Sequence, residues 1–289
     1  MSCGDDASPS DESGPEVTTS APQTTTTRGA DAAPGFEVER IAYGDDPNQF
    51  GDLVVASDAV GPLPVIVLIH GGFWRNEFRL DLAIPQASNA AAAGYAAWNI
   101  EYRRVGDAGG GYPGTLEDVA AAIDHLAALA SDHDLDLDRV AVVGHSAGGH
   151  LALWAGQRER LGPGAPGGEP VVIPRLVVGQ APVADLANNL DLGGGAVEAL
   201  MGTTPADDGA AYDVADPARL LPVAVPQLIV HGALDDIVPA ERSLAYGELV
   251  GDDEALEIVV IEGIGHFEVI APTDESWQIA LDRIEAVLR

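Results

Sequence analysis

A serine stands between two glycines at the point where a run of apolar residues ends. Residues 139–154 read RVAVVGHSAGGHLALW, so Ser146 lies in a G-x-S-x-G pattern between Gly144 and Gly148. Such glycines permit a sharp strand-to-helix turn that projects the hydroxyl above a sheet. The free N–H groups and the dipole at the helix start stabilise a negative oxygen there. The pattern predicts a nucleophilic Ser146; the alternative is a tight turn in which the serine only caps the helix.

A nucleophilic serine requires a histidine base and an acid that orients the histidine. In hydrolases with this kind of turn, the acid and then the histidine follow the serine, each after a later strand. Asp235 and Asp236 follow the apolar run PQLIVH, and His266 follows the run LEIVVIEG. Parallel strands deliver the side chains at their carboxyl ends to one edge of the sheet. We therefore expect Ser146, His266 and one of the two aspartates to meet there.

The negative oxygen formed during acyl transfer needs two N–H donors. Ala147, directly after the serine, is expected to supply one of them. The second is expected from the loop HGGFW after an earlier buried strand, where Gly71, Gly72, Phe73 and Trp74 follow His70. Two glycines allow the backbone to approach a substrate carbonyl closely, although a plain Gly-Gly turn is the alternative.

The other polar residues near predicted strand ends have structural explanations. His70 and His231 end buried strands and are expected to form hydrogen bonds within the fold. His150 comes one helical turn after the serine and is expected to pack beneath it. Asp185 follows the preceding strand, which is too early in the chain for the triad acid.

Apolar runs alternate with helical patterns from residue 36 to the end of the chain. Predicted strands cover 36–44, 50–57, 64–72, 95–102, 139–144, 175–182, 226–232 and 256–263, and predicted helices cover 80–93, 115–129, 147–157 and 275–288. Pro85 is expected to interrupt the first helix and Thr115 to cap the second. This alternation predicts an α/β fold with a mostly parallel central sheet and helices on both faces. Residues 183–222 break the alternation and are expected to form a cap or lid over one end of the sheet.

The composition excludes several classes of function. The net charge is −32, and all 14 basic residues are arginine. Such a surface repels phosphate backbones, so we expect no nucleic-acid partner. This charge is typical of salt-adapted proteins; the alternative is a proteome that is poor in lysine. The sequence contains no apolar run long enough for a transmembrane segment, and it lacks metal-binding and phosphate-loop patterns, so we expect neither metal nor cofactor.

The first 35 residues differ from the rest of the chain. Residues 1–35 are rich in Ser, Thr, Pro and Asp, which predicts a disordered tail before a domain at 36–289. The only cysteine, Cys3, precludes an intramolecular disulfide. Its surroundings resemble the mature end of a bacterial lipoprotein, so we expect an exported or cell-surface protein with a lipid anchor at Cys3. The alternative is a cytoplasmic protein with a flexible extension.

Six motifs in their expected order extend these predictions. They are HGGFW, WNIEYRR, GYPGTLEDV, GHSAGGHLALW, HGALDDIVP and GHFEVIAP. Together they resemble the esterase/lipase branch of the α/β-hydrolase superfamily, including feruloyl/acetyl esterase-like and kynurenine formamidase-like enzymes. The resemblance implies that Asp235 is the acid and His266 the base. Phe73 replaces the third glycine found in many such esterases, which is closer to the formamidase-like group.

The chemistry expected from these residues is the hydrolysis of a small-molecule carboxylic ester through an acyl-serine. Phe73, Trp74 and Tyr112 are expected to line an aromatic pocket, although packing in the core is the alternative for Trp74. Hydrolysis of C–N bonds, by an arylformamidase-like enzyme or a peptidase, is the second hypothesis. The third is a non-catalytic protein that only binds the ligand.

Overall fold

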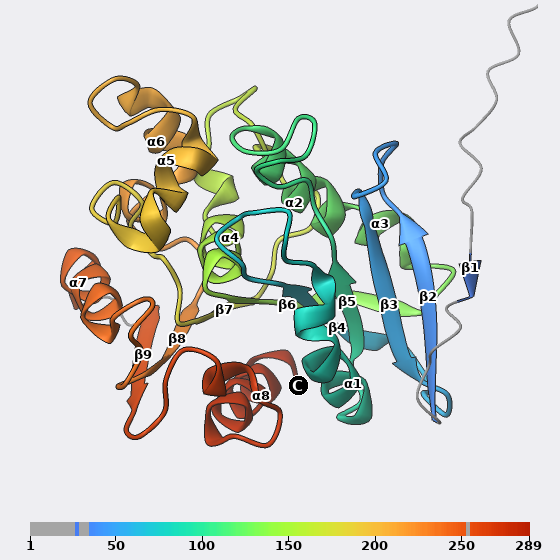
Figure 1. The fold of residues 1–289 in the computed structure, drawn as a ribbon. Helices are drawn as coiled ribbons and strands as arrows, with labels where there is room; N and C mark the ends of the chain where they lie inside the picture. Colours follow the sequence, from blue (N-terminus) through green and yellow to red (C-terminus); the bar gives the residue numbers. More distant parts are fainter. Residues whose placement is uncertain (1–26, 29–34, 253–254) are drawn as a thin grey trace, which may run out of the picture.

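The computed structural model describes residues 27–28, 35–252 and 255–289. Most of the predicted tail, 1–35, and the predicted lipid site at Cys3 lie outside these ranges. One mixed sheet with strand order β1-β2-β3-β5-β4-β6-β7-β8-β9 forms the centre of the described part (Figure 1). The first three strands pair antiparallel, β3 also pairs antiparallel with β5, and all pairs from β5 to β9 are parallel. The strands are β1 (Thr27–Arg28), β2 (Phe36–Ala42), β3 (Phe50–Ala56), β4 (Leu63–Ile69), β5 (Ala96–Ile100), β6 (Leu135–His145), β7 (Leu176–Gln180), β8 (Gln227–Gly232) and β9 (Leu256–Ile261).

Helices cover both faces of this sheet, as the alternating pattern predicts. The α-helices are α1 (Ile84–Ala92), α2 (Gly114–Asp124), α3 (Leu126–Leu129), α4 (Ala147–Ala155), α5 (Ala196–Met201), α6 (Gly209–Ala215), α7 (Ala240–Val250) and α8 (Glu275–Leu288). Short 3-10 helices are η1 (Leu80–Ala83), η2 (Arg158–Arg160), η3 (Leu192–Gly194), η4 (Pro217–Arg219) and η5 (Glu268–Ile270). Helices α1 and α8 pack on one face, and α2, α3 and α4 pack on the other.

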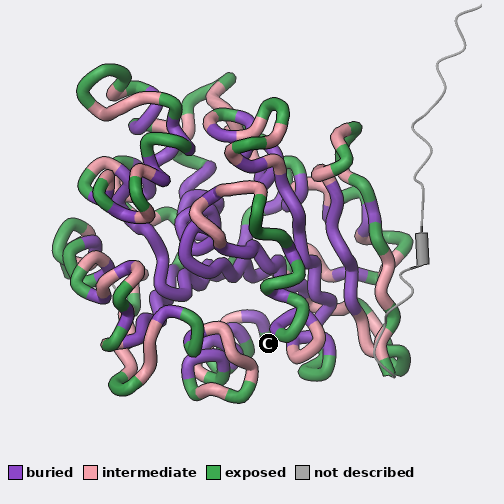
Figure 2. Tube along the Cα trace, in the orientation of Figure 1, coloured by how far each residue is buried: buried purple, intermediate pink, exposed green. Residues whose placement is uncertain are grey.

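The central strands are buried on both faces. In β4, the side chains of Val65, Val67 and Ile69 join the core on one face, whereas Ile66 and Leu68 join the core on the other. Figure 2 shows the buried residues concentrated along the strands in the middle of the molecule. A continuous run of β-branched and leucine side chains is therefore required in β4, because neither face is exposed to solvent.

The predicted helical stretch 80–93 divides just before Pro85, as expected, into η1 and α1, and Pro85 lies in the first turn of α1, where its missing N–H costs no hydrogen bond. The prediction for the start of the second helix is wrong. Thr115 is not the N-cap of α2, which begins at Gly114 after Pro113. The Thr115 hydroxyl instead donates to the carbonyl of Arg103 and accepts from the N–H of Gly111, so it secures the loop before the helix.

Residues 183–222, predicted as a cap, form η3, α5, α6 and η4 and pack against the rest of the domain. The N–H of Tyr112 donates to the carbonyl of Leu200 at 2.7 Å. The guanidinium of Arg75 donates to the carbonyl of Gly193 at 2.9 Å. These bonds attach the segment to the loops after β4 and β5. Within the described ranges, no helix combines the length and apolar character needed to cross a bilayer.

Candidate active site

Ser146 lies at a strained turn between β6 and α4. Its φ and ψ of 55° and −117° place a non-glycine residue in a sparsely populated region of backbone conformation. The flanking glycines are required by close packing: a Cβ on Gly144 would lie 2.0 Å from the Gly148 carbonyl oxygen, and one on Gly148 would lie 2.1 Å from that of Ile69. The Ser146 N–H donates to the carbonyl of Gln180 at 2.8 Å, which helps to hold the turn. The serine is 4% exposed.

The loops after β8 and β9 bring Asp235 and His266 together. Oδ2 of Asp235 lies 2.6 Å from Nδ1 of His266, and both residues are buried. Oδ1 of Asp235 accepts hydrogen bonds from the N–H groups of Ile237 and Val238 at 2.9 and 2.8 Å. The neighbouring Asp236 is exposed. Of the two aspartates that follow β8, the structure therefore pairs Asp235 with the histidine.

The charge of Asp235 is supported by a second histidine. Nε2 of His231 lies 2.7 Å from the Val238 carbonyl oxygen and 3.2 Å from Oδ2 of Asp235, while Nδ1 lies 2.8 Å from the hydroxyl of Ser243. Burial opposes ionisation of Asp235, but the bonds from His231 and His266 outweigh it and hold the pKa of this carboxyl well below its ordinary value. His231 is structural, as predicted, but its contact with the aspartate was not foreseen. The four-residue spacing from His231 to Asp235 was the available signal.

A third histidine, His145, packs against His266. Their ring centroids lie 4.6 Å apart, and Nε2 of His145 donates to the backbone oxygen of His266 at 2.9 Å. Burial, reinforced by the neighbouring His266 ring, lowers the pKa of His145 to about 3, so this ring is neutral at ordinary pH. In the sequence pattern, His145 is only the variable position before Ser146. The structure makes it the contact between the serine turn and the loop that carries His266.

The serine and the histidine lie at the same edge of the sheet. Ser146 follows His145 directly, and the His145 ring contacts His266. Among the described residues, Nδ1 to Asp235 is the one side-chain hydrogen bond found for His266, which leaves Nε2 for proton exchange. Hydrogen bonds between such a serine and its base often close only when the substrate is bound. The same described residues contain no cluster of three or more side chains suited to hold a metal ion.

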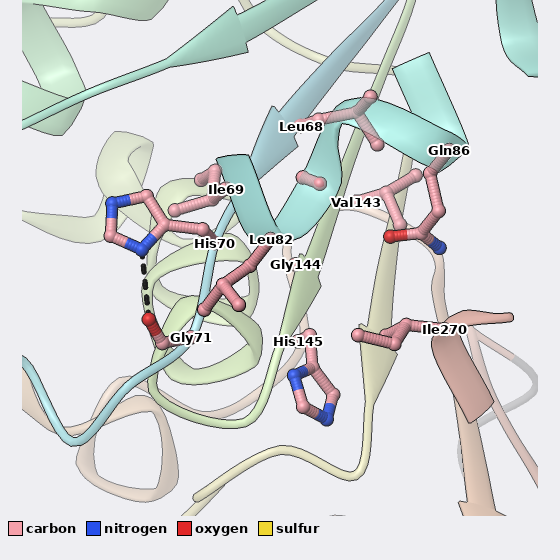
Figure 3. A pocket seen from close by; sticks show the side chains of 11 residues that line it. Leu68, Ile69, His70, Gly71, Leu82, Gln86, Val143, Gly144, His145 and Ile270 are labelled. Carbon is pink, nitrogen blue, oxygen red and sulfur yellow. Dashed lines mark hydrogen bonds between the residues drawn. The ribbon is translucent and has the colours of Figure 1, made fainter. Parts of the chain in front are cut away.

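The loop after β4 lies against the serine turn. A Cβ on Gly71 would lie 2.7 Å from the His145 carbonyl oxygen and 3.2 Å from Cβ of Ser146. Gly72 and Phe73 follow with φ of 115° and 56°. Figure 3 shows Gly71 and His145 near each other where β4 and β6 end. The close approach explains why this loop begins with glycine.

The loop after β4 and the start of α4 each carry backbone N–H groups near the serine turn. The N–H of Ala147 belongs to the first turn of α4, where it has no partner within the helix. In the part of the chain that the structure describes, the N–H groups of Gly72 and Phe73 donate to no other group. These three N–H groups therefore have no hydrogen-bond acceptor among the described residues.

The predicted aromatic residues occupy different environments. Trp74 is 1% exposed and packs edge-on against His150, with ring centroids 5.4 Å apart, so it belongs to the core beneath the serine turn. Phe73 is half-buried and lies 6.3 Å from the exposed ring of Phe78. Tyr112 is half-buried and packs against the core.

Comparison with known proteins gives a consistent assignment. The family model described as BD-FAE matches residues 52–249. The chain is 35% identical over 118 residues to "Esterase LipC" of Mycobacterium tuberculosis, covering 40% of this chain and 29% of that protein. It is 34% identical over 98 residues to "Probable carboxylic ester hydrolase LipM" of the same organism, covering 34% of this chain and 22% of that protein. The matched segments thus span less than a third of the length of these curated relatives.

Solved structures share the fold. A bifunctional GH43-CE protein of Bacteroides eggerthii superposes with a TM-score of 0.75 and 23% identity, over 90% of this chain and 39% of that one. Esterase B of Lactobacillus rhamnosis superposes with a TM-score of 0.73 and 22% identity, over 87% and 84% of the two chains. The family match covers well over half of the residues, and the sheet order and serine turn agree with it. The chain therefore belongs to the BD-FAE family, and it has the α/β-hydrolase fold of the solved esterases.

Proposed function

We propose that this protein hydrolyses carboxylic esters with Ser146 as nucleophile, His266 as base and Asp235 as the acid that orients the base. The observation that carries the proposal is the 2.6 Å bond between Asp235 and His266, located beside a serine at a strained strand-to-helix turn. The esterase names of the curated relatives support ester hydrolysis.

The reaction has two steps. Nε2 of His266 takes the proton of the Ser146 hydroxyl as the serine oxygen attacks the ester carbonyl. The N–H groups of Ala147, Gly72 and Phe73 stabilise the resulting oxygen anion. His266 then gives the proton to the leaving alcohol, which yields an acyl-serine. A water molecule, deprotonated by His266, attacks this ester, and the released acid and the free Ser146 hydroxyl complete the cycle.

The ionised Asp235 keeps His266 in the form that this reaction requires. Nδ1 of His266 must carry hydrogen to donate to the carboxylate, so Nε2 is the nitrogen that accepts the serine proton. When His266 becomes a cation, the neighbouring carboxylate stabilises it. His145 adds no charge beside that cation, because burial keeps it neutral.

The substrates are neutral esters with an apolar or aromatic group. Phe73 and Phe78 lie on the loop after β4, and the exposed ring of Phe267 lies 5.2 Å from that of His266. These side chains offer apolar contact area near the serine. The net charge of −32 disfavours anionic substrates.

Covalent labelling and a substrate panel test the proposal. A fluorophosphonate is expected to label wild-type protein at Ser146 and to leave Ser146→Ala unlabelled. p-Nitrophenyl esters of increasing acyl length, assayed beside N-formylkynurenine and a peptide amide, are expected to give turnover on the short esters. Turnover only on the C–N substrates would favour an arylformamidase-like enzyme or a peptidase. An unlabelled, inactive but folded wild-type protein would favour a ligand-binding function.

The cellular location is proposed from the sequence of residues 1–35 alone. Cys3 carries a lipid that anchors an exported protein to the cell surface, with the Ser/Thr/Pro-rich segment as a spacer. Metabolic labelling with a fatty-acid probe in the native host is expected to mark the wild type and not Cys3→Ser. Unlabelled protein in the cytoplasmic fraction would support the cytoplasmic alternative.

A further inference from the structure

A second buried histidine–carboxylate pair lies next to the loop that offers N–H donors to the substrate. His70 directly follows β4, and Glu101 directly follows the neighbouring β5. Nε2 of His70 lies 2.9 Å from Oε1 of Glu101, and both side chains are fully buried. Neither residue has a part in the two steps of ester hydrolysis described above.

The partners of the His70 ring determine how many protons it carries. Nδ1 lies 2.8 Å from the Gly71 carbonyl oxygen, which can only accept, so Nδ1 carries hydrogen (Figure 3). Nε2 faces the carboxylate of Glu101. If that carboxylate is ionised it can also only accept, and Nε2 then carries hydrogen as well.

Several groups around Glu101 favour its ionised form. Oε1 faces the guanidinium of Arg104 at 2.9 Å and the N–H of Tyr102 at 3.2 Å, besides His70. Oε2 accepts from the N–H of Leu80 at 3.2 Å and lies 3.6 Å from Nε of Arg79. All of these are donors, and none would accept a proton from the carboxyl group. Burial opposes ionisation, but these donors outweigh it and lower the pKa of Glu101.

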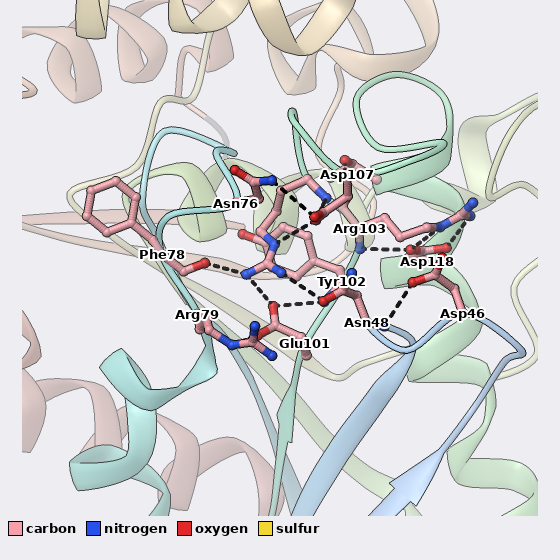
Figure 4. Close-up of polar contacts among 12 residues, drawn as sticks. Asp46, Asn48, Asn76, Phe78, Arg79, Glu101, Tyr102, Arg103, Asp107 and Asp118 are labelled. Carbon is pink, nitrogen blue, oxygen red and sulfur yellow. Dashed lines mark hydrogen bonds and ion pairs between the residues drawn. The ribbon is translucent and has the colours of Figure 1, made fainter.

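The surroundings of the pair hold the ring in place. The Tyr102 ring stacks on the His70 ring, with centroids 4.5 Å apart and planes 18° apart, and its hydroxyl donates to the His70 carbonyl at 2.8 Å. Figure 4 shows Glu101 among Arg79, Tyr102 and Asn48. The Arg104 guanidinium also donates to Asn48 and lies 3.4 Å from Asp107. The ring is therefore fixed from the side of β5 and of the loop that follows it.

We propose that His70 is a doubly protonated imidazolium held by Glu101, and that it is a positioning residue for the donors that stabilise the oxygen anion. The peptide between Gly71 and Gly72 is trans, so its C=O and N–H point in opposite directions. The bond from His70 fixes the Gly71 carbonyl on the core side and thereby turns the Gly72 N–H toward the side of Ser146. The positive ring also adds favourable charge near the developing anion. The positioning role depends on the proposed ester hydrolysis, whereas the protonation state does not.

Nitrogen NMR of the histidine rings tests the protonation state without any assay. In wild-type protein near neutral pH, both ring nitrogens of His70 are expected to carry hydrogen, with the signals assigned by their loss in His70→Asn. A ring with one protonated nitrogen would overturn the proposal.

A matched pair of variants tests the positioning role. Glu101→Gln removes the charge that retains the second proton; Asp118→Asn removes another fully buried carboxylate, which pairs with Arg103 at 2.6 Å and contacts neither His70 nor Gly71. Loss of one anion-stabilising donor lowers kcat by about 100-fold or more, so we expect Glu101→Gln to lower kcat about 10- to 100-fold with little change in KM. Its His70 ring is expected to show one protonated nitrogen. Asp118→Asn is expected to keep the wild-type kcat and the doubly protonated ring.

The possible outcomes separate the two proposals. An equal loss of kcat in the two variants, or an unchanged kcat in Glu101→Gln, would overturn the positioning role. If Glu101→Gln does not fold, His70→Asn tests the same role, because its amide can still donate to Gly71; its kcat should exceed that of His70→Ala, and equal values would count against the role. A wild-type protein that reacts with no ester and no fluorophosphonate would remove the proposed function, while the ring spectra would still decide the state of His70.

Discussion

Two histidine–carboxylate pairs lie next to segments that contact the serine turn. The pair formed by Asp235 and His266 has a contact of 2.6 Å and comes from the loops after β8 and β9. The pair formed by Glu101 and His70 has a contact of 2.9 Å and comes from the ends of β5 and β4. All four side chains are buried, so neither distance nor burial separates a catalytic pair from a structural one.

The second ring nitrogen separates them. Nδ1 of His266 bonds its aspartate, and its Nε2 is available for the serine proton. His70 uses Nε2 for its carboxylate and Nδ1 for the Gly71 carbonyl, so it has no nitrogen left to accept a proton. A base needs one open nitrogen, whereas a positioning residue is most effective when both are occupied. A histidine and a carboxylate therefore have different roles in the two pairs, because different atoms face the second ring nitrogen of each histidine.

Identical substitutions at the two histidines test this difference most strongly. His266→Ala is expected to lower kcat on p-nitrophenyl acetate by about 100,000-fold or more, as for loss of the base in a serine triad. His70→Ala is expected to lower kcat by about 100-fold, since it affects only the anion-stabilising donors. Thermal unfolding serves as the control, because only folded variants enter the comparison. Equal losses of kcat would show that the open nitrogen of His266 does not distinguish the pairs.

Neighbouring aspartates provide the next largest difference. Asp235→Asn is expected to lower kcat by about 10,000-fold, because an amide cannot hold the required form of the histidine ring. Asp236→Asn changes the same functional group one residue further along the chain, at an exposed position, and is expected to leave kcat near the wild-type value. Steady-state kinetics on one ester measure both. A larger loss in Asp236→Asn would transfer the role of the acid to that residue.

Much of this arrangement could be predicted from local patterns. The apolar runs of β4 to β9 and the final helix, 275–288, follow from composition, because strands buried on both faces tolerate little else. The region of Asp235 and His266 could be predicted because the carboxyl ends of parallel strands share an edge. The break near Pro85 could be predicted because a proline is tolerated in the first turn of a helix but not in its interior.

The contacts that distinguish the two pairs could not be predicted. His70 was expected to be structural, but its link to Glu101 depends on the register of β4 with β5, which no local pattern encodes. The contact of His145 with His266 joins residues 121 positions apart in the chain. Such contacts depend on how loops from different strands pack, and a single sequence contains no direct signal of that packing.

His231 contacts the carboxylate of the Asp235–His266 pair. In the described part of the chain, no second histidine contacts the carboxylate of the Glu101–His70 pair. His231→Leu removes the donor to Asp235, so the pKa of that carboxyl is expected to rise toward its ordinary value. Protonation of Asp235 should then inactivate the enzyme at a higher pH than in the wild type, still in the acid range, with a loss of activity at neutral pH of about tenfold or less. His231→Gln, which retains an N–H donor, should show a smaller shift. A pH profile identical to the wild type in both variants would show that His231 only packs beneath the aspartate.

The smallest expected effect on activity concerns His145, which contacts the proposed catalytic pair and is neutral. Its pKa in the folded protein is about 3, against an ordinary value of 6.5. Between these values the unfolded chain binds a proton that the folded protein does not, so the free energy of unfolding falls as pH falls. The full difference corresponds to about 5 kcal/mol. His145→Gln removes this titration and should lose less stability than the wild type between neutral and acidic pH.

Denaturant unfolding measures the difference, with His133→Gln as the control in a surface loop. If His145→Gln lost as much stability in acid as the wild type, the buried His145 ring would already be charged in the folded protein. The rings of His145 and His266 would then compete for the carboxylate of Asp235.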